Sequence, residues 1–259
     1  MSLKKLAWFV PVFGLLCSVQ AMAFDHSSWD GLLKKYLNQK HLFNYKALQK
    51  AKPDRSVLNA YTKALNKVSK KEFLSWSKND RKAFLINAYN AMTIIVIVDY
   101  MDKEGAVSSI KDLGSLFSST WKKSWPQIKL LDGTIETLDG IEHDTLRKDY
   151  PDYRIHAAVN CASWSCPILR REAYQGSTLD ATLDEQMNLW LKDSTRNQYD
   201  VKNKTLKLSK IFDWYAEDFG DKSKLKEIFN KYGPAEAKQV VSGDFSTSFL
   251  DYDWKLNQQ

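Results

Sequence analysis

Glycine is scarce in this chain, and its scarcity excludes several classes of protein. There are 10 glycines among 259 residues, and neither GxGxxG nor GxxxxGK[ST] occurs. Without such loops the backbone has no glycine cradle for the phosphates of a nucleotide. The GxSxG and HExxH motifs are also missing, which removes the common serine hydrolase and zinc protease signatures. We therefore expect no cofactor and no metal site.

A surface stripe of one charge sign is also absent. The formal net charge is +7, but the lysine pairs at 34–35, 70–71 and 122–123 are interleaved with acidic residues. A nucleic-acid groove needs basic residues that cluster. We expect no nucleic-acid partner.

No apolar run reaches the length of a membrane span without interruption by polar residues. A shorter apolar run lies near the N-terminus. Lys4 and Lys5 precede the apolar run 6–17, and Ala21-Met22-Ala23 follows it. This order is typical of a secretory signal peptide, and the run is shorter than the roughly 20 residues of a membrane span. We predict a signal peptide over 1–23, cleavage after Ala23, a periplasmic or secreted location, and no stable membrane insertion.

Helical periodicity dominates the first half of the mature chain. Residues 24–69 form a predicted N-terminal helical extension, and residues 70–257 the main domain. The strongest helix begins at Ser77 with a capping box to Asp80, runs toward Met101, and is apolar nearly all round, so it should be buried. It carries two amides, Asn87 and Asn90. They either tie loop backbone in place or point at a site.

The second half mixes hairpins and helices. This mixture predicts an α+β single domain with a buried central helix, a small antiparallel sheet or hairpins, and surrounding helices. The expected elements are a hairpin at Asp132-Gly133, a short helix from Asp139 that puts His143 and Arg147 on one face, a strand over 154–160, a helix from Ser177 to Lys192, a hairpin over 198–209 and a helix over 223–232.

The stretch RIHAAVNCASWSCPILR, residues 154–170, carries the chemistry. On a strand, Arg154, His156 and Asn160 share one face and Cys161 lies on the apolar one. Cys166 precedes Pro167, which favours the first position of a helix, and a thiol at a helix start has a lowered pKa.

Several interpretations of the two cysteines remain open. Cys166 is a candidate nucleophile, with His156 or His143 as the base and Asn160 as polar support. A structural Cys161–Cys166 disulfide fits a secreted chain. A reversible redox pair is a third interpretation. Zinc is the weakest, because CxxxxC is not a usual zinc spacing.

Five ordered motifs resemble the domain-of-unknown-function 547 family over residues 70–257. They are FLINAYNAMTI (84–94), LDGIEHDTLR (138–147), RIHAAVNCASWSCPILRREAY (154–174), LSKIFDWYAEDF (208–219) and FLDYDWKLN (249–257). The resemblance matches the family pattern at Asn87, Tyr89, Asn90, Glu142, His143, Arg147, Arg154, His156, Asn160, Cys161, Ser165, Cys166 and Pro167. It also implies a distant link to papain-like or transglutaminase-like folds.

Three functions follow as expectations, and whether the protein is an enzyme stays open. The first is a thiol-dependent hydrolase or acyl transferase acting on peptide or amide substrates. The second is a non-catalytic module with a structural disulfide, which binds a peptide or glycan in a groove lined by Trp164, Trp214 and Trp254. The third is an envelope thiol-redox protein. The expected supporting residues are Asn87, Tyr89, Asn90, Glu142, Arg147, Arg154 and Trp164.

Overall fold

The computed structural model describes residues 23–114 and 119–259, and its elements are those of an α+β single domain. The predicted signal peptide falls almost wholly on residues 1–22, outside the described residues. The elements are α1 (Ser27–Tyr36), α2 (Tyr45–Lys50), α3 (Lys52–Lys67), α4 (Lys70–Ser75), α5 (Lys78–Glu104), η1 (Ile110–Leu113), α6 (Leu130–Gly133), α7 (Leu138–Ile141), η2 (Glu142–Arg147), η3 (Tyr153–Ala157), η4 (Gly176–Thr178), α8 (Leu179–Lys192), β1 (Gln198–Asp200), β2 (Thr205–Leu208), α9 (Ile211–Trp214), α10 (Ala216–Phe219), α11 (Lys222–Tyr232), α12 (Ala235–Val241) and β3 (Ser246–Phe249).

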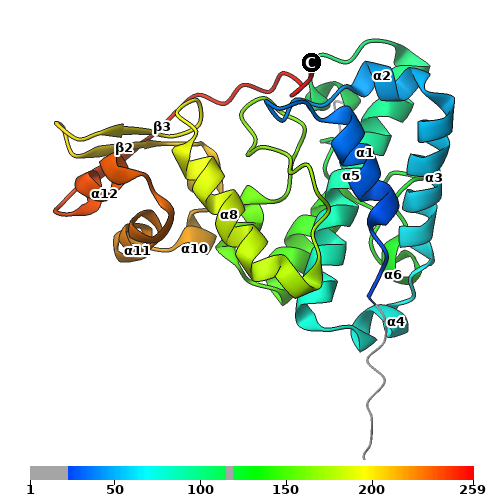
Figure 1. The fold of residues 1–259 in the computed structure, drawn as a ribbon, viewed down its shortest axis with the longest axis horizontal. Coiled ribbons are helices and arrows are strands. Elements are labelled where there is room, and N and C mark those ends of the chain that lie inside the picture. Colours follow the sequence, from blue (N-terminus) through cyan, green and yellow to red (C-terminus); the bar gives the residue numbers. More distant parts are fainter. Residues whose placement is uncertain (1–22, 115–118) are drawn as a thin grey trace, which may run out of the picture.

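Helix α5 forms the centre of the larger part of the molecule. The Ser77 hydroxyl accepts from the Asp80 amide at 3.1 Å, so the predicted cap is present. The helix is long and apolar enough to cross a membrane, but 89% of its apolar window is buried in the protein interior. Helices α2 and α3 pack against it, α1 packs on α2 and α3, and their buried side chains belong to one hydrophobic cluster. Figure 1 shows these helices in the same part of the molecule as α5. It is therefore the buried central helix that the sequence predicts.

A second hydrophobic cluster lies at the other end of the molecule. It joins α8, α11 and α12 to a three-stranded sheet (Figure 1). Strands β1 and β2 form the predicted antiparallel hairpin, but β3 pairs with β2 in parallel. The sheet is thus mixed rather than antiparallel. After α12 the chain enters β3 at the end of the sheet where β2 begins, so Thr205 pairs with Ser246 and the two strands run in the same direction.

Three local predictions were wrong. The hairpin at Asp132-Gly133 reduces to one bridge between Leu130 and Ile135. The strand over 154–160 is instead the 3₁₀-helix η3, whose start is capped by the Asp152 carboxylate accepting from the Arg154 amide at 3.1 Å. Such local side-chain to backbone bonds compete with strand pairing.

No helix follows Pro167, where the chain is irregular up to η4. Cys166 therefore does not lie at a helix start, and a helix dipole does not act on it.

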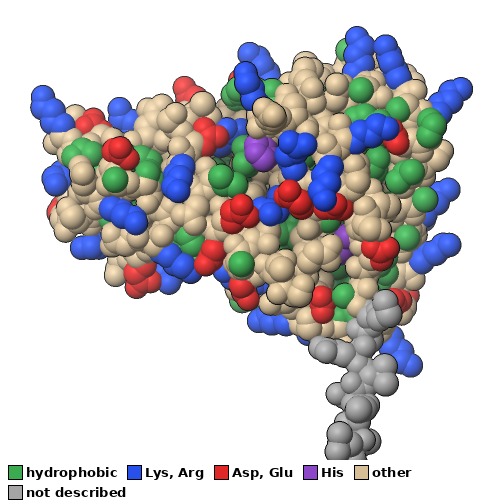
Figure 2. Space-filling view, in the orientation of Figure 1, with side chains coloured by type: hydrophobic (Ala, Val, Ile, Leu, Met, Phe, Trp, Pro, Cys, Tyr) green, Lys and Arg blue, Asp and Glu red, His purple; other side chains and the backbone are tan. Residues whose placement is uncertain are grey.

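Charged side chains of both signs are dispersed over the face of the molecule seen in Figure 2. Figure 2 shows lysine and arginine scattered among aspartate and glutamate on one face, with no continuous basic band on that face.

Candidate functional site

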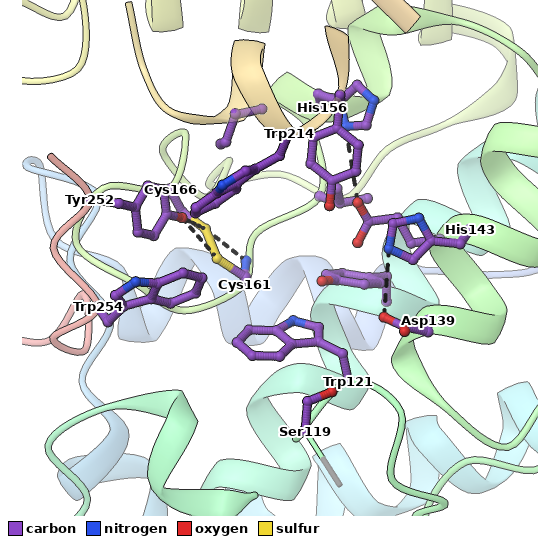
Figure 3. Close-up of a pocket in the computed structure, with 15 residues that line it drawn as sticks. Ser119, Trp121, Asp139, His143, His156, Cys161, Cys166, Trp214, Tyr252 and Trp254 are labelled. Carbon is purple, nitrogen blue, oxygen red and sulfur yellow. Dashed lines mark hydrogen bonds and ion pairs between the residues drawn. A yellow bond between two sulfur atoms is a disulfide. The ribbon is translucent and has the colours of Figure 1, made fainter. Parts of the chain in front are cut away.

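A cavity of about 240 Å³ lies where the two hydrophobic clusters meet. Its walls come from α5, α7, η2, η3, α9 and the C-terminal segment, so residues far apart in sequence converge on it. The lining residues are Tyr89, Ser119, Trp121, Asp139, Glu142, His143, His156, Val159, Cys161, Cys166, Ile211, Trp214, Tyr215, Tyr252 and Trp254. In Figure 3 the two cysteines lie beside Tyr252 and Trp254, whereas His143 and Asp139 lie on the other side.

The C-terminal segment holds one wall of this cavity against the cysteine loop, residues 160–167. The Ser165 amide donates to the Asp253 carbonyl at 3.2 Å, and the Asp253 amide donates back to the Ser165 hydroxyl at 2.9 Å. These paired bonds place Tyr252 and Trp254 on either side of Asp253 at the cavity. The closing motif of the chain is therefore part of the site.

Cys161 and Cys166 are joined by a disulfide. Cys166 is 2% exposed, whereas Cys161 is partly exposed. The Cys166 sulfur accepts hydrogen bonds from the Cys161 amide at 3.0 Å and from the Tyr252 hydroxyl at 3.2 Å. Burial raises the pKa of Tyr252, so its hydroxyl keeps its proton at neutral pH. Among the described residues, neither sulfur is hydrogen-bonded to an imidazole.

The opposite wall is built by α7 and the π-helix η2. Thr137 caps α7 by accepting from the Gly140 amide at 2.8 Å, which corrects the expectation that Asp139 is the cap. The wider π turn follows at once, and such turns are frequent at functional sites. His143 and Arg147 lie on one face as predicted, because Arg147 Nη1 donates to His143 Nδ1 at 2.9 Å. On the cavity side, Asp139 Oδ1 lies 3.6 Å from His143 Nε2.

Behind this wall, Asp218 binds both His156 and Arg147. His156 Nε2 donates to Asp218 Oδ2 at 2.6 Å, and Arg147 grips both carboxylate oxygens at 2.6 and 2.9 Å. Burial acts to raise the pKa of Asp218, but the hydrogen bonds from His156 and Arg147 outweigh it and hold the pKa well below the usual range. The His156 ring is stacked on Tyr215 at 4.1 Å between centroids. His156 is therefore fixed in orientation.

Glu142 is the most buried carboxylate of the cavity, with 4% of its surface exposed. Tyr89 and Tyr215 lie against it. Burial, the negative charge of Glu142 and hydrogen bonding to its carboxylate raise the pKa of both tyrosines. Two protonated phenols thus face one carboxylate, while His156 Nδ1 is 4.0 Å from Glu142 Oε1.

Asn160 lies in the cysteine loop but does not reach the cavity. Its Oδ1 accepts from the Ala162 amide at 2.8 Å and from Asn257 Nδ2 at 3.1 Å, and its Nδ2 donates to the Pro167 carbonyl at 2.7 Å. Ala162 has φ +62°, a left-handed conformation that costs roughly 1 kcal/mol or more and that this bond helps to hold. Asn160 is thus a positioning residue for the loop.

Five other predicted site residues also lie outside the cavity, and one of them is Arg147, which binds Asp218 behind the wall. Asn87 exchanges two hydrogen bonds with the backbone of Tyr174, and Asn90 bridges the backbone at 158 and 160. Both amides tie loops to α5, which is the structural alternative that the sequence left open. Arg154 binds the carboxylates of Asp152, Asp180 and Asp184, and Trp164 is 41% exposed at the surface.

Among the residues whose role sequence reasoning missed, four line the cavity, namely Trp121, Asp139, Tyr215 and Tyr252. Asp218 was also missed, and it binds His156 behind the wall. The fourth and fifth ordered motifs contain Tyr215, Asp218 and Tyr252. Their presence in motifs of the same family pattern was the signal that could have placed them in one site. Among the residues that the structure describes, no group of His, Cys, Asp or Glu side chains is arranged to hold a metal ion.

The fold and cavity define an α+β domain in which a disulfide, carboxylates and aromatic rings share one small cavity. Residues 73–191 match the model of the family described as "Protein of unknown function, DUF547". No curated protein and no solved structure matches the chain. The expected link to papain-like or transglutaminase-like folds therefore gains no support.

Proposed function

We propose that this protein is an exported thiol–disulfide exchange protein and that Cys161–Cys166 is its redox centre. One observation carries the proposal: the disulfide lies in the wall of a cavity, with the sulfur of Cys166 held by two hydrogen-bond donors. The signal peptide predicted from the sequence supports it, because exported compartments are where such disulfides persist.

The Tyr252 hydroxyl lies 3.2 Å from both sulfurs, but only the Cys166 sulfur accepts from the Cys161 amide, and the two residues differ in exposure. These differences give the exchange a direction. Cys161 is the more exposed residue of the pair, so an incoming thiolate attacks its sulfur. The S–S bond breaks, its electron pair goes to Cys166, and the incoming sulfur is joined to Cys161 as a mixed disulfide. The Cys161 amide and the Tyr252 hydroxyl then stabilise the Cys166 thiolate. Stabilising a leaving thiolate speeds exchange.

A second thiolate completes the cycle. It attacks the external sulfur of the mixed disulfide and displaces the Cys161 thiolate. Two external thiols thereby become one disulfide, and their two protons and two electrons reduce the protein to the dithiol. The reverse sequence reduces an external disulfide.

Trapping of the mixed disulfide tests the proposal. In Cys166→Ser, reduced Cys161 should capture a small disulfide such as the Ellman reagent as a stable adduct seen by mass spectrometry. In Cys161→Ser, the buried Cys166 should react at least tenfold more slowly. Equal reactivity of the two variants would remove the assigned direction, and a wild-type disulfide that dithiothreitol cannot reduce without unfolding the protein would refute the function.

Hydrolysis or acyl transfer by a reduced Cys166 is the second candidate. It is favoured by the presence of His143, His156 and Glu142 in the same cavity as the sulfurs. It ranks below redox exchange because the contacts of the sulfurs are to Tyr252, Ser163 and a backbone amide. Turnover of a p-nitrophenyl ester or anilide by the reduced protein, abolished in Cys166→Ser, would favour this candidate instead.

A further inference from the structure

The cavity wall facing the disulfide holds a carboxylate that lacks a strong partner. Asp139 has 20% of its side chain exposed, and burial raises its pKa although His143 and Lys122 act to lower it, so the charge of Asp139 is only partly compensated. Within the described part of the chain, no hydrogen-bond donor reaches its carboxylate. Its nearest polar contact is His143 Nε2 at 3.6 Å.

His143 Nε2 lies beyond hydrogen-bond distance of that carboxylate. Arg147 Nη1 can only donate, so His143 Nδ1 accepts from it at 2.9 Å. The charge of Arg147 is in turn matched by Asp218, which it grips with two hydrogen bonds. The nearby arginine therefore does not neutralise Asp139.

The remaining wall is aromatic. Trp254 packs against Trp121 at 5.6 Å and against Trp214 at 5.4 Å between ring centroids. Aromatic faces attract cations, and Lys111 already lies 3.9 Å over the ring of Trp254. Lys111 is not one of the lining residues, and among the described residues the lining includes carboxylates and aromatic rings but no lysine or arginine.

We propose that the cavity selects small thiol or disulfide compounds that carry a protonated amine. The amine lies between the carboxylates of Asp139 and Glu142 and the aromatic rings, and the sulfur reaches Cys161. This inference rests on the proposed exchange function and names its substrate class. A cavity of about 240 Å³ fits a compound of this size, because sites for drug-sized ligands run from roughly 300 to 1,000 Å³.

The net charge of the chain and the charge of the cavity favour thiols of opposite charge. The formal net charge is +7, and loss of Lys4 and Lys5 with the predicted signal peptide leaves +5, so an unspecific field effect favours an anionic thiol. A preference for the cationic thiol would therefore come from the cavity.

The test compares three small thiols that differ mainly in charge: cysteamine, 2-mercaptoethanol and 2-mercaptoethanesulfonate. Reduction of the wild-type disulfide is followed at low salt, and rates are divided by the thiolate concentration of each compound. We expect cysteamine to be at least tenfold faster than the sulfonate. Asp139→Asn should reduce that ratio about fivefold while the rate with neutral 2-mercaptoethanol stays within twofold. The matched control is Asp149→Asn, which removes an exposed carboxylate beyond η2 and should keep the wild-type ratio.

The outcomes separate the two proposals. Equal thiolate-corrected rates for all three compounds, each well above that of a model disulfide, would overturn the charge selection and leave the exchange function standing. The same loss of selectivity in Asp149→Asn as in Asp139→Asn would overturn the assignment to the cavity. Failure of all three thiols to reduce the disulfide faster than a model disulfide would overturn both proposals.

Discussion

His156 Nε2 donates to Asp218 Oδ2 over 2.6 Å, joining η3 to α10 behind the cavity wall. Arg147 completes this contact from η2 by binding both oxygens of the same carboxylate. One ionised side chain thus holds three elements that build the site. The consequences are open to measurement.

Asp218→Asn should lower the free energy of unfolding at pH 7 by roughly 2–3 kcal/mol, because it removes charge-assisted bonds to two partners. The folded-state pKa of Asp218 is depressed. Its contribution is therefore present above the unfolded value of about 3.9 and is lost as the pH falls through the folded-state value. Urea unfolding at pH 7 and pH 3 should show a smaller gap between wild type and variant at pH 3. The exposed neighbour Glu217→Gln serves as the control, and a gap that is equal at both pH values would contradict this reasoning.

His26 should make stability depend on pH in a second window. Burial lowers the pKa of His26 to about 4, against about 6.5 in the unfolded chain. The unfolded state then binds the extra proton first. Stability is full above about pH 6.5 and falls by up to about 3 kcal/mol as the pH drops toward 4.

His26→Gln should flatten this slope. The substituted amide retains a group able to bond the Tyr61 hydroxyl, which lies 2.6 Å from His26 Nδ1. Urea unfolding at half-unit steps between pH 4 and 8 provides the comparison. Parallel curves for wild type and variant would show that His26 is not the titrating group.

Reduction of Cys161–Cys166 should cost about 2 kcal/mol of stability, the chain-entropy value for so short a ring. Chemical unfolding with and without dithiothreitol measures the difference. The double variant Cys161→Ser with Cys166→Ser should unfold identically in both conditions. A collapse of the fold on reduction would instead identify the bond as an indispensable staple and argue against a cycling role.

Asn160→Ala should destabilise the protein by about 3 kcal/mol, because three hydrogen bonds of the cysteine loop are lost. The exposed Asn203→Ala, in the turn between β1 and β2, should cost much less. Thermal and urea unfolding give both values. If the Asn160→Ala protein kept its stability but no longer exchanged disulfides, Asn160 would take part in the exchange reaction and not only in positioning the loop.

Much of the fold is set by local sequence. The cap at Ser77 and the apolar run that follows it specify α5, since neither depends on a distant partner. The β1–β2 hairpin is local in the same way. By contrast, the segment 154–160 reads as a strand by alternation but folds as η3, where Asp152 caps the turn.

The sequence by itself determined that two cysteines, two histidines and a glutamate lie in short motifs, together with the buried helix that carries Tyr89. Tertiary structure alone decided which of them share a cavity, because Tyr215 and Tyr252 line it from later parts of the chain and Asp218 binds His156 behind its wall. Asp218 lies 62 residues after His156, and Tyr252 lies 86 residues after Cys166. Periodicity reports which face of an element is apolar. Periodicity does not indicate which loops come together in space. The contacts of His156 with Asp218 and of Cys166 with Tyr252 therefore depend on tertiary packing.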